Sequence, residues 1–454
     1  MSGHLSRRDF VRIVGASGLA AGVGTGAMGP MNRALADPPK EGPAMPGVFV
    51  EGKANPQAAT LTGGKVIQPQ RELPLLHKTD VLVVGGGPAG VTAAIAAARS
   101  GAKTTLVERY GHFGGLWTGG LVVLVIGHIV DGKKQVGQGI GEEMMQRLDK
   151  LDRGIVNRKP GVNPTVDAEA LKYVMVELIV DAGVDVFLHC WGVDAIMDGN
   201  TVRGAVFESK SGRQAILADV VIDATGDGDV FSAAGAEHER RKYNIGLVCR
   251  IGNLDRVDPS KNKGKPPKHL GDPTPIQGVN WVNMGGPDAD GLDVAELSRL
   301  ELNHRRQIWK NVEAIRHTPG YEPVYLVETA PQMGVRITRV LAGLKTLRMD
   351  DVKANTKFSD VIAVGGAWDG KHNEWQIPYG ALVPKTVEGL LAAGRCISGE
   401  PRMADLIRVI PNCFVTGHAA GAAAALAIKD KCPPRNVDVA KLQKLLLAQK
   451  AYLG

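Results

Sequence analysis

The sequence lacks the cysteine and aromatic patterns that several protein classes need. None of its five cysteines forms a C-x-x-C pair, so a redox-active dithiol, a zinc site and an attached c-type haem all lack support. Aromatic residues make up only 5% of the chain, too few for a nucleic-acid binder built on stacking platforms. Because the number of cysteines is odd, at least one thiol is free or pairs between chains, and we expect most to be buried and inert.

An excess of charge of one sign is also missing. The formal net charge of +7 is mild for 454 residues, and the one lysine-rich stretch, residues 261–268, contains two prolines and is typical of a solvated loop. With 44% hydrophobic and 22% charged residues the chain is typical of a globular protein, and its length predicts two or three domains. Glycine is abundant, with 58 residues, many in short clusters, as expected where backbone approaches a ligand.

The beginning of the chain has the three parts of a twin-arginine export signal. A twin-arginine pattern at residues 6–11 precedes a weakly apolar run, residues 13–28, and an A-x-A sequence ends at Ala36. We therefore expect a signal peptide over residues 1–36, passage through the twin-arginine machinery, cleavage near Ala36 and a periplasmic or secreted product. The run is too rich in glycine to favour stable membrane insertion. Residues 37–78 contain seven prolines and are expected to form a linker.

A dinucleotide-binding pattern follows the expected linker. Residues 79–84 are apolar and partly β-branched, which predicts a buried parallel strand. A G-x-G-x-x-G sequence at residues 85–90 comes next, followed by an alanine-rich stretch, residues 91–100, which predicts a buried helix. A second strand is expected over residues 103–107 and ends in the acid Glu108. This order of strand, glycine turn, helix, strand and acid predicts a dinucleotide site.

Each residue type in this pattern has a physical role in such a site. Gly85 makes the tight turn, Gly87 lets the backbone approach a pyrophosphate, and Gly90 lets the helix pack against the strand. The amino terminus of the helix offers free N–H groups to phosphates. Glu108 can accept hydrogen bonds from ribose hydroxyls and disfavours a 2′-phosphate. The alternative is a glycine-rich turn that holds no ligand.

Further sequence blocks distinguish between the two candidate dinucleotides, FAD and NAD. A second glycine-rich stretch directly after Glu108 indicates backbone passing beside an extended cofactor. With the other blocks, in this order, the chain resembles the FAD-dependent oxidoreductase family of the glutathione-reductase-type flavoprotein fold over most of residues 79–430. The blocks that carry the resemblance are residues 109–120, 218–229, 328–336, 377–384 and 390–395, followed by residues 407–412 and an Ala/Gly-rich helix expected from about 414 to 428.

The resemblance implies an α/β fold. It would consist of an FAD/NAD(P)-binding Rossmann-like domain with three ββα layers and an inserted α+β substrate or cap domain. The expected parts are an FAD-binding domain over 79–240 and 385–430, a cap domain over 241–384 and a C-terminal helix in 431–454. Residues 398–406 depart from the family pattern, so the substrate and mechanism of relatives are not carried over.

The resemblance also implies which residues hold a non-covalent FAD. The ADP half would be held by Gly85, Gly87, Pro88, Ala89, Gly90, Glu108 and Arg109. The pyrophosphate and the ribityl chain would lie near Gly114, Gly115 and Thr118, with a second contact from Thr225, Gly226 and Asp227. The ribityl chain and the flavin ring would be approached by Gly394, Arg395, Ile407 and Asn412. A helix that starts near Pro411 would direct the positive end of its dipole at the pyrimidine edge of the flavin.

Catalytic side chains are harder to identify, because a flavin performs the redox step and the protein orients the substrate and handles a proton. The candidates are His372, Arg336, Arg408 and Glu400. His372 lies between two tryptophans in residues 368–375, which either line a pocket or form a simple turn. Arg336 and Arg339 are three residues apart and either clamp a carboxylate together or pair with phosphates and acids. No metal site is expected.

The sequence therefore predicts an exported FAD-dependent dehydrogenase or reductase that acts on an unidentified small organic molecule. Its electron partner would be a quinone or cytochrome, because the sequence has no second complete G-x-G-x-x-G in a strand–helix context and NAD(P)H is not freely available outside the cytoplasm. An oxygen-using flavin oxidase, a simple NAD dehydrogenase and a secreted binding protein that keeps FAD as structure remain as alternatives. No nucleic-acid partner is expected.

Overall fold

The computed structural model describes residues 58–159, 161–367 and 374–454. The chain divides into two compact units, Met1–Gln70 and Arg71–Gly454. In the first unit, an antiparallel hairpin is formed by the strands β1 (Thr60–Thr62) and β2 (Lys65–Ile67). The described part of the expected linker thus contains regular structure. The expected signal peptide lies outside the described residues.

The second unit has a mixed α/β fold built on a seven-stranded sheet. Its strand order is β10-β11-β12-β3-β4-β9, and β23 pairs with one end of β12. The pairs that join β3, β4, β9, β12 and β23 are parallel, whereas those of β10 and β11 are antiparallel. The strands are β3 (Leu75–Val84), β4 (Thr104–Val107), β9 (Asp185–Phe187), β10 (Trp191–Asp198), β11 (Thr201–Ser209), β12 (Gly212–Asp223) and β23 (Leu390–Ala392).

The parallel strands end together at one edge of the sheet. Val84 pairs with Val107 on one side and with Asp223 on the other, and Asp223 pairs with Ala392. The strand expected at residue 79 begins at Leu75, because its first residues pair with the long strand β12. This register brings the segments that follow four separate strands to the same edge, where α/β sheets bind ligands.

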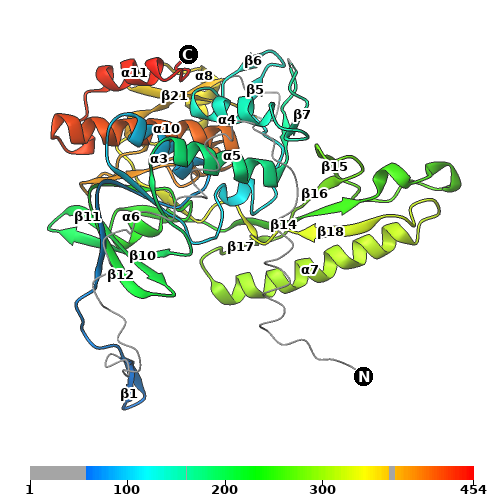
Figure 1. Ribbon diagram of the computed structural model, residues 1–454, viewed down its shortest axis with the longest axis horizontal. Helices are drawn as coiled ribbons and strands as arrows, with labels where there is room; N and C mark the ends of the chain where they lie inside the picture. The colour runs from blue at the N-terminus through cyan, green and yellow to red at the C-terminus, as the bar shows by residue number, and fades with distance from the viewer. Residues whose placement is uncertain (1–57, 160, 368–373) are drawn as a thin grey trace, which may run out of the picture. The chain divides into compact units, whose positions relative to one another are not determined.

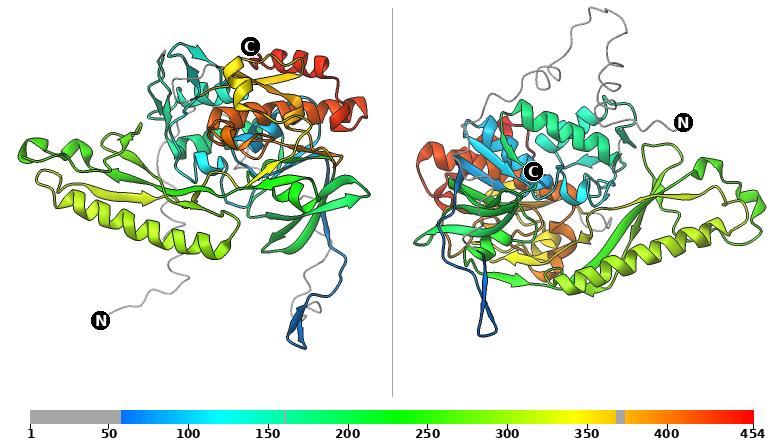
Figure 2. Two further views of the ribbon diagram at one scale, coloured as in Figure 1. Left: turned by 180° about the vertical axis from the view of Figure 1, so that it is seen from behind. Right: turned by 60° about the horizontal axis from the view of Figure 1, so that its bottom comes forward.

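Two small-residue helices cover the sheet side by side (Figures 1 and 2). The helix α3 (Pro88–Arg99) follows the glycine turn, and α10 (Ile410–Asp430) comes from the end of the chain. A side chain at Gly417 or Gly421 would overlap backbone carbonyl oxygens of α3. Glycine is required at both positions because the two helix backbones approach so closely. The helix expected from residue 414 begins one turn earlier, since Ile410 and Pro411 already belong to it.

A second sheet follows in the chain. Its central strand β14 (Tyr243–Gly252) pairs with β16 (Asn280–Met284) and β18 (Tyr325–Thr329). The long helix α7 (Val294–Arg316) packs along β14 and β18, as Figure 1 shows. Its first turn is capped by Asp293, whose side chain accepts from two backbone N–H groups. The apolar run at residues 247–251 predicts a strand and the helical spacing of residues 294–315 predicts a helix, and the structure contains both.

Among the described residues, no single helix is long and apolar enough to cross a membrane. Pro401–Ile407 and Ile410–Asp430 reach that length only together, across a bend of 88°.

Short elements complete the second unit. The remaining elements are β5 (Ile129–Val130), β6 (Lys134–Gln135), α4 (Ile140–Leu148), β7 (Ile155–Val156), β8 (Thr165–Val166), α5 (Ala168–Asp181), α6 (Asp229–Ala233), β13 (His238–Arg240), β15 (Asp272–Pro273), β17 (Asp288–Ala289), β19 (Gly334–Val335), β20 (Arg339–Leu341), α8 (Met349–Ala354), β21 (Val361–Gly365), β22 (Trp375–Pro378), α9 (Ala404–Ile407) and α11 (Val439–Ala448).

Candidate active site

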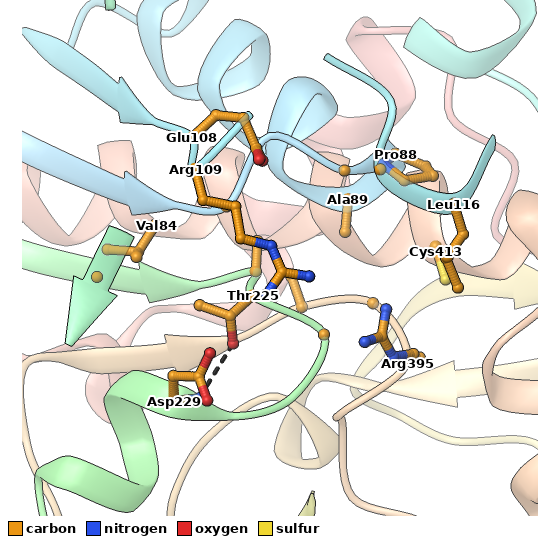
Figure 3. Close-up of a pocket in the computed structure, with 18 of the residues that line it drawn as sticks. Val84, Pro88, Ala89, Glu108, Arg109, Leu116, Thr225, Asp229, Arg395 and Cys413 are labelled. Carbon is orange, nitrogen blue, oxygen red and sulfur yellow. Dashed lines mark hydrogen bonds between the residues drawn. The ribbon is translucent and has the colours of Figure 1, made fainter. Parts of the chain in front are cut away.

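A cavity lies at the edge where the parallel strands end (Figure 3). It encloses about 820 Å³ of empty space when its open mouth is included. Eleven of the residues expected to hold a cofactor line it, and they come from the ends of β3, β4, β12 and β23. These residues are Gly85, Gly87, Pro88, Ala89, Glu108, Arg109, Gly115, Thr225, Gly226, Gly394 and Arg395.

The three glycines of the turn after β3 play different parts. Gly85 has a positive φ of 102°, and a Cβ there would lie 2.5 Å from the carbonyl oxygen of Ala224. A Cβ on Gly90 would overlap the carbonyl oxygen of Gly85, so this glycine lets α3 fold back onto its own turn. A Cβ on Gly87 would meet nothing within 4 Å. The missing side chain of Gly87 therefore leaves open space in the cavity.

The amino terminus of α3 faces this open space. The helix begins at Pro88, and its first intrahelical bond runs from the amide of Val91 to the carbonyl oxygen of Gly87 at 3.0 Å. The first turn contains no acidic residue that would occupy its free amides. Free N–H groups and the positive end of the helix dipole thus remain for an anionic ligand.

Glu108 and Arg109 form the wall next to the turn. Glu108 is 6% exposed, and its carboxylate accepts hydrogen bonds from the amides of Gly86 (2.6 Å) and Tyr110 (2.8 Å). Both oxygens retain lone pairs for further donors such as ribose hydroxyls. The side chain of Arg109 runs from the end of β4 across the cavity towards Thr225 (Figure 3). This arrangement places a carboxylate held by two backbone amides and a guanidinium group on one side of the ligand space.

A buried acid that the sequence analysis did not select holds the opposite wall. Asp223 ends β12 and is fully buried. Its carboxylate accepts from the amide and hydroxyl of Thr225 (3.1 and 2.7 Å) and from the amides of Val230 and Phe231 (both 2.9 Å). Burial nevertheless raises the pKa of Asp223. An acid at the buried end of a strand, directly before A-T-G-D, was the available signal in the sequence.

Two polar atoms in the cavity have no partner among the described residues. The Nε of Arg395 and the Oε1 of Gln332 are both buried and unpaired, although both residues line the cavity. Arg395 uses its Nη2 to donate to Asp227 at 2.7 Å. Buried polar groups are normally satisfied, so an unpaired donor and an unpaired acceptor fit a site built for a polar ligand. With the cradle at Gly87, the residues present fit a dinucleotide such as FAD.

Six of the expected cofactor residues do not line the cavity: Gly90, Gly114, Thr118, Asp227, Ile407 and Asn412. Their direct contact with a cofactor stays a prediction. The hydroxyl of Thr118 donates to the carbonyl of Phe113, and Asn412 binds the backbone of Gly366 and Leu406. Asp227 is occupied by Arg395 and Thr338. Of these side chains, Asp227 holds a residue of the cavity lining, Arg395, in place.

The catalytic candidates are separated in the structure. Arg408 lines the cavity, whereas Glu400 does not: its carboxylate accepts from the amide of Met349 (2.9 Å) and from Arg402 (2.8 Å). A role of Glu400 in proton transfer is not supported by this position. The expected pairing of Arg336 with Arg339 is also not observed, because Arg339 binds Asp229 at 3.0 Å. His372 lies outside the described residues.

A second cavity adjoins the first and contains Arg336. It encloses about 1070 Å³ including its mouth and reaches the strands β14 and β16 through Val248 and Trp281. Both cavities are lined by Leu116, Arg395, Arg408 and Ile410. Ile410 is the first residue of α10, so this helix begins where the cavities meet. The expected helix start near Pro411 is confirmed.

The cysteines and metal-binding residue types suggest no further chemistry at the site. All five cysteines are free and four are buried, as expected. Burial raises the pKa of Cys249 and of Cys413, which lines the first cavity, to about 12. These thiols therefore stay protonated and poorly nucleophilic. Within the described ranges, no group of three or more His, Cys, Asp or Glu side chains is arranged to hold a metal ion.

One carboxyl group of the first cavity gives a pH-dependent prediction. Burial and the neighbouring charges of Asp227 and Asp223 raise the pKa of Asp229 to about 6, despite the ion pair with Arg339. The folded state then holds this proton more tightly than the unfolded state, whose pKa is near 3.8. The contribution of this group to the free energy of unfolding is therefore highest below pH 4 and falls as pH rises to about 6.

The variant Asp229→Asn should remove this dependence. Above pH 6 we expect it to exceed the parent protein in free energy of unfolding by about 2–3 kcal/mol, and below pH 4 the two should agree. Chemical denaturation at a series of pH values measures the difference. A constant difference between pH 4 and pH 7 would contradict the assignment.

Curated proteins match the chain over part of its length. A thiamine thiazole synthase from Metallosphaera sedula is 30% identical over 37% of this chain and 60% of its own length. A 6-methylpretetramide 4-monooxygenase from Streptomyces rimosus is 30% identical over 36% of this chain and 42% of its own length. The chain thus covers less than two thirds of these curated relatives.

Solved structures and a family model match a larger share of this chain than the curated proteins do. A geranylgeranyl bacteriochlorophyll reductase-like protein from Thermoplasma acidophilum has a TM-score of 0.47 at 18% identity and covers 83% of this chain and 84% of its own. A p-nitrophenol 4-monooxygenase from Pseudomonas putida has a TM-score of 0.47 at 13% identity, covering 83% and 89%. The family model described as FAD dependent oxidoreductase matches residues 80–244 and 250–446. The chain therefore belongs to the FAD-dependent oxidoreductase family, and FAD is its cofactor.

Proposed function

We propose that this protein is an exported FAD-dependent dehydrogenase or reductase whose small organic substrate binds in the second cavity. The observation that carries the proposal is the junction of the two cavities at Leu116, Arg395, Arg408 and Ile410. A cofactor in the first cavity and a substrate in the second would meet there. In this proposal the sheet around β14, with α7, serves as the inserted substrate domain beside a Rossmann-like FAD domain.

The protein's own residues have distinct tasks in this proposal. FAD, when bound, supplies the acceptor or donor of the electrons. The free amides of α10 favour negative charge where the cavities meet. Arg408 lies on the same junction and orients the substrate, while the apolar wall beyond Leu116 excludes water. A proton carrier is not assigned among the described residues.

The electron partner is proposed to be a quinone or cytochrome outside the cytoplasm. Support comes from the twin-arginine pattern at residues 6–11 and from the lack of a second complete G-x-G-x-x-G in a strand–helix context of the sequence. Anaerobic mixing of the purified yellow protein with candidate substrates tests the proposal. We expect a subset of them to bleach the flavin absorption and a quinone analogue to restore it faster than oxygen does. Faster restoration by oxygen would indicate an oxidase, and no bleaching by any compound would indicate a binding protein.

Filling the junction should separate cofactor binding from turnover. In Leu116→Trp the larger ring should occupy space shared by both cavities. We expect FAD content to be retained and the rate of flavin bleaching to fall by about 100-fold, because a displacement of about 1 Å between reactants has effects of that size. Leu344→Trp, at a position that is 48% exposed, is the matched control. Parental bleaching rates in Leu116→Trp would remove the junction from the proposal.

A further inference from the structure

All the charged side chains that line the second cavity in the described part of the chain are positive. Three arginines, Arg336, Arg395 and Arg408, line it, and no Asp or Glu is among its described lining residues. Arg395 is neutralised by Asp227 at 2.7 Å and also borders the first cavity. The other two guanidinium groups therefore decide which ligand this cavity accepts.

Arg336 has no carboxylate partner among the described residues. Its Nη1 donates to the carbonyl oxygen of Asn244 at 3.0 Å and to the side-chain oxygen of the same residue. Burial and the positive charge of Arg408 lower the pKa of Arg336. Both causes act against the charged form, which is nevertheless retained because arginine stays protonated at neutral pH. An anion bound beside Arg336 would stabilise its charged form against both burial and the charge of Arg408.

Arg408 is only partly paired. Its Nε donates to Asp405 at 3.1 Å, and its Nη2 binds the same oxygen. Its guanidinium group also lies over the ring of Tyr243, 5.9 Å from the centroid, and is hydrogen-bonded to that side chain, so its five N–H donors are only partly used. Two neighbouring guanidinium groups that both retain donors form an arrangement that suits a carboxylate, which accepts several charge-assisted hydrogen bonds.

Apart from Asn283, the other side chains that line the cavity are apolar or belong to Trp281. Val122, Leu124, Ile126 and Val248 form a continuous aliphatic wall beside Trp281. Trp281 is 4% exposed, and its indole Nε1 is buried without a partner in the described part of the chain. This donor adds to those of the arginines, so the polar groups of the cavity mostly donate hydrogen bonds. A small inorganic anion would leave the aliphatic wall without contact.

We infer that the substrate is a monocarboxylate with an apolar body, whose carboxylate is bound by Arg336 and Arg408. Its body lies against the wall of Val122, Leu124 and Val248. This inference rests on the proposed function, because it places the substrate in the same second cavity. It adds the chemical class of the substrate and assigns Arg336 to its recognition.

Binding of inert probes to the FAD-loaded protein tests the inference without turnover. Octanoate, 1-octanol and octylamine share one chain and differ in the head group, and calorimetry or the change in flavin absorption reports their binding. We expect octanoate to bind and the other two to bind at least about 10-fold more weakly, since charged hydrogen bonds are lost. Each CH₂ from butanoate to octanoate should tighten binding roughly three- to fourfold as it meets the aliphatic wall.

Two variants decide whether Arg336 carries the preference. Arg336→Met keeps the length of the side chain and removes its charge, and it should weaken octanoate roughly 10- to 100-fold with unchanged FAD content. Arg306→Met removes one charge from the exposed side of α7 and should bind octanoate like the parent protein. Equal octanoate affinity in all three proteins would overturn the inference. Loss of FAD in Arg336→Met with unchanged octanoate affinity would also overturn it, because Arg336 would then serve the cofactor.

The test separates this inference from the proposed function. If another class of compound bleaches the flavin and octanoate does not bind, the inference fails and the proposed function stands. If octanoate binds through Arg336 and no carboxylate or other compound bleaches the flavin, the site is supported and the enzymatic role fails.

Discussion

Gly87→Val is expected to give a folded protein that contains no FAD. The Cβ of a side chain at this position would meet no atom within 4 Å, so the valine does not disturb the turn or the packing of α3. It would, however, occupy the space in front of the free amides of α3, where we expect the phosphates to bind. A loss of a few phosphate hydrogen bonds amounts to several kcal/mol, so FAD content should fall below about one tenth of the parental value.

Absorption of the flavin per chain measures this effect, and circular dichroism checks the fold. Gly285→Val is a matched control, because its Cβ would have only ordinary contacts, 3.8 Å from Asn244, and it does not line the first cavity. It should retain its colour. Gly90→Val provides the opposite case: its side chain would overlap the Gly85 carbonyl, so the variant should misfold. A fully yellow Gly87→Val protein would contradict the placement of the phosphates.

Asp223→Ala is expected to lower the free energy of unfolding by about 4 kcal/mol and to reduce FAD binding as well. The fully buried carboxylate is the acceptor for three backbone amides and one hydroxyl in the segment from Thr225 to Phe231. Alanine would leave these donors buried and unpaired, at about 1–3 kcal/mol each before relaxation. The segment carries Thr225, Gly226 and Asp229 of the cavity wall, so its loosening should weaken the cofactor site.

Asp223→Asn should not rescue this loss. An amide has one acceptor oxygen, and its NH₂ group would face backbone N–H groups that also donate. Asp219→Ala, at an exposed position of the same strand, is the control and should change stability by less than about 0.5 kcal/mol. Urea denaturation of the FAD-free proteins gives the comparison. A loss under about 1 kcal/mol in Asp223→Ala would show that the segment is held by other contacts.

The turn, the acid and the ends of the parallel strands were predictable from the sequence because local signals determine them. The strand before Gly85 and the acid after the next strand lie close together in the chain, so their spacing alone predicts the geometry of one side of the site. The segment after β12 was also identified, since an apolar run led directly into A-T-G-D. Residues selected from these segments line the first cavity, and their contacts with FAD stay predictions.

Other features of the site depend on how side chains pack in the folded protein. Thr118 and Asn412 carry suitable polar groups, but the backbone carbonyls of Phe113, Leu406 and Gly366 already bind them. Arg336 and Arg408 are more than seventy residues apart, and only the packing of the second sheet brings them into one cavity. Spacing in the sequence left Arg339 either as the second arm of a carboxylate clamp or as the partner of an acid or phosphate, and in the fold it pairs with Asp229. Such pairings depend on tertiary contacts that no local pattern reports.

The packing of α10 on α3 has a consequence for the order of events during synthesis. The glycine turn is made early, but the strand and helix that complete its surroundings, β23 and α10, come from the last part of the chain. A ribosome that has released only the first three hundred residues has produced the glycine turn and Glu108 without α10, the helix that packs on α3. We therefore expect cofactor capture to follow the completion of translation and prematurely terminated chains to stay colourless.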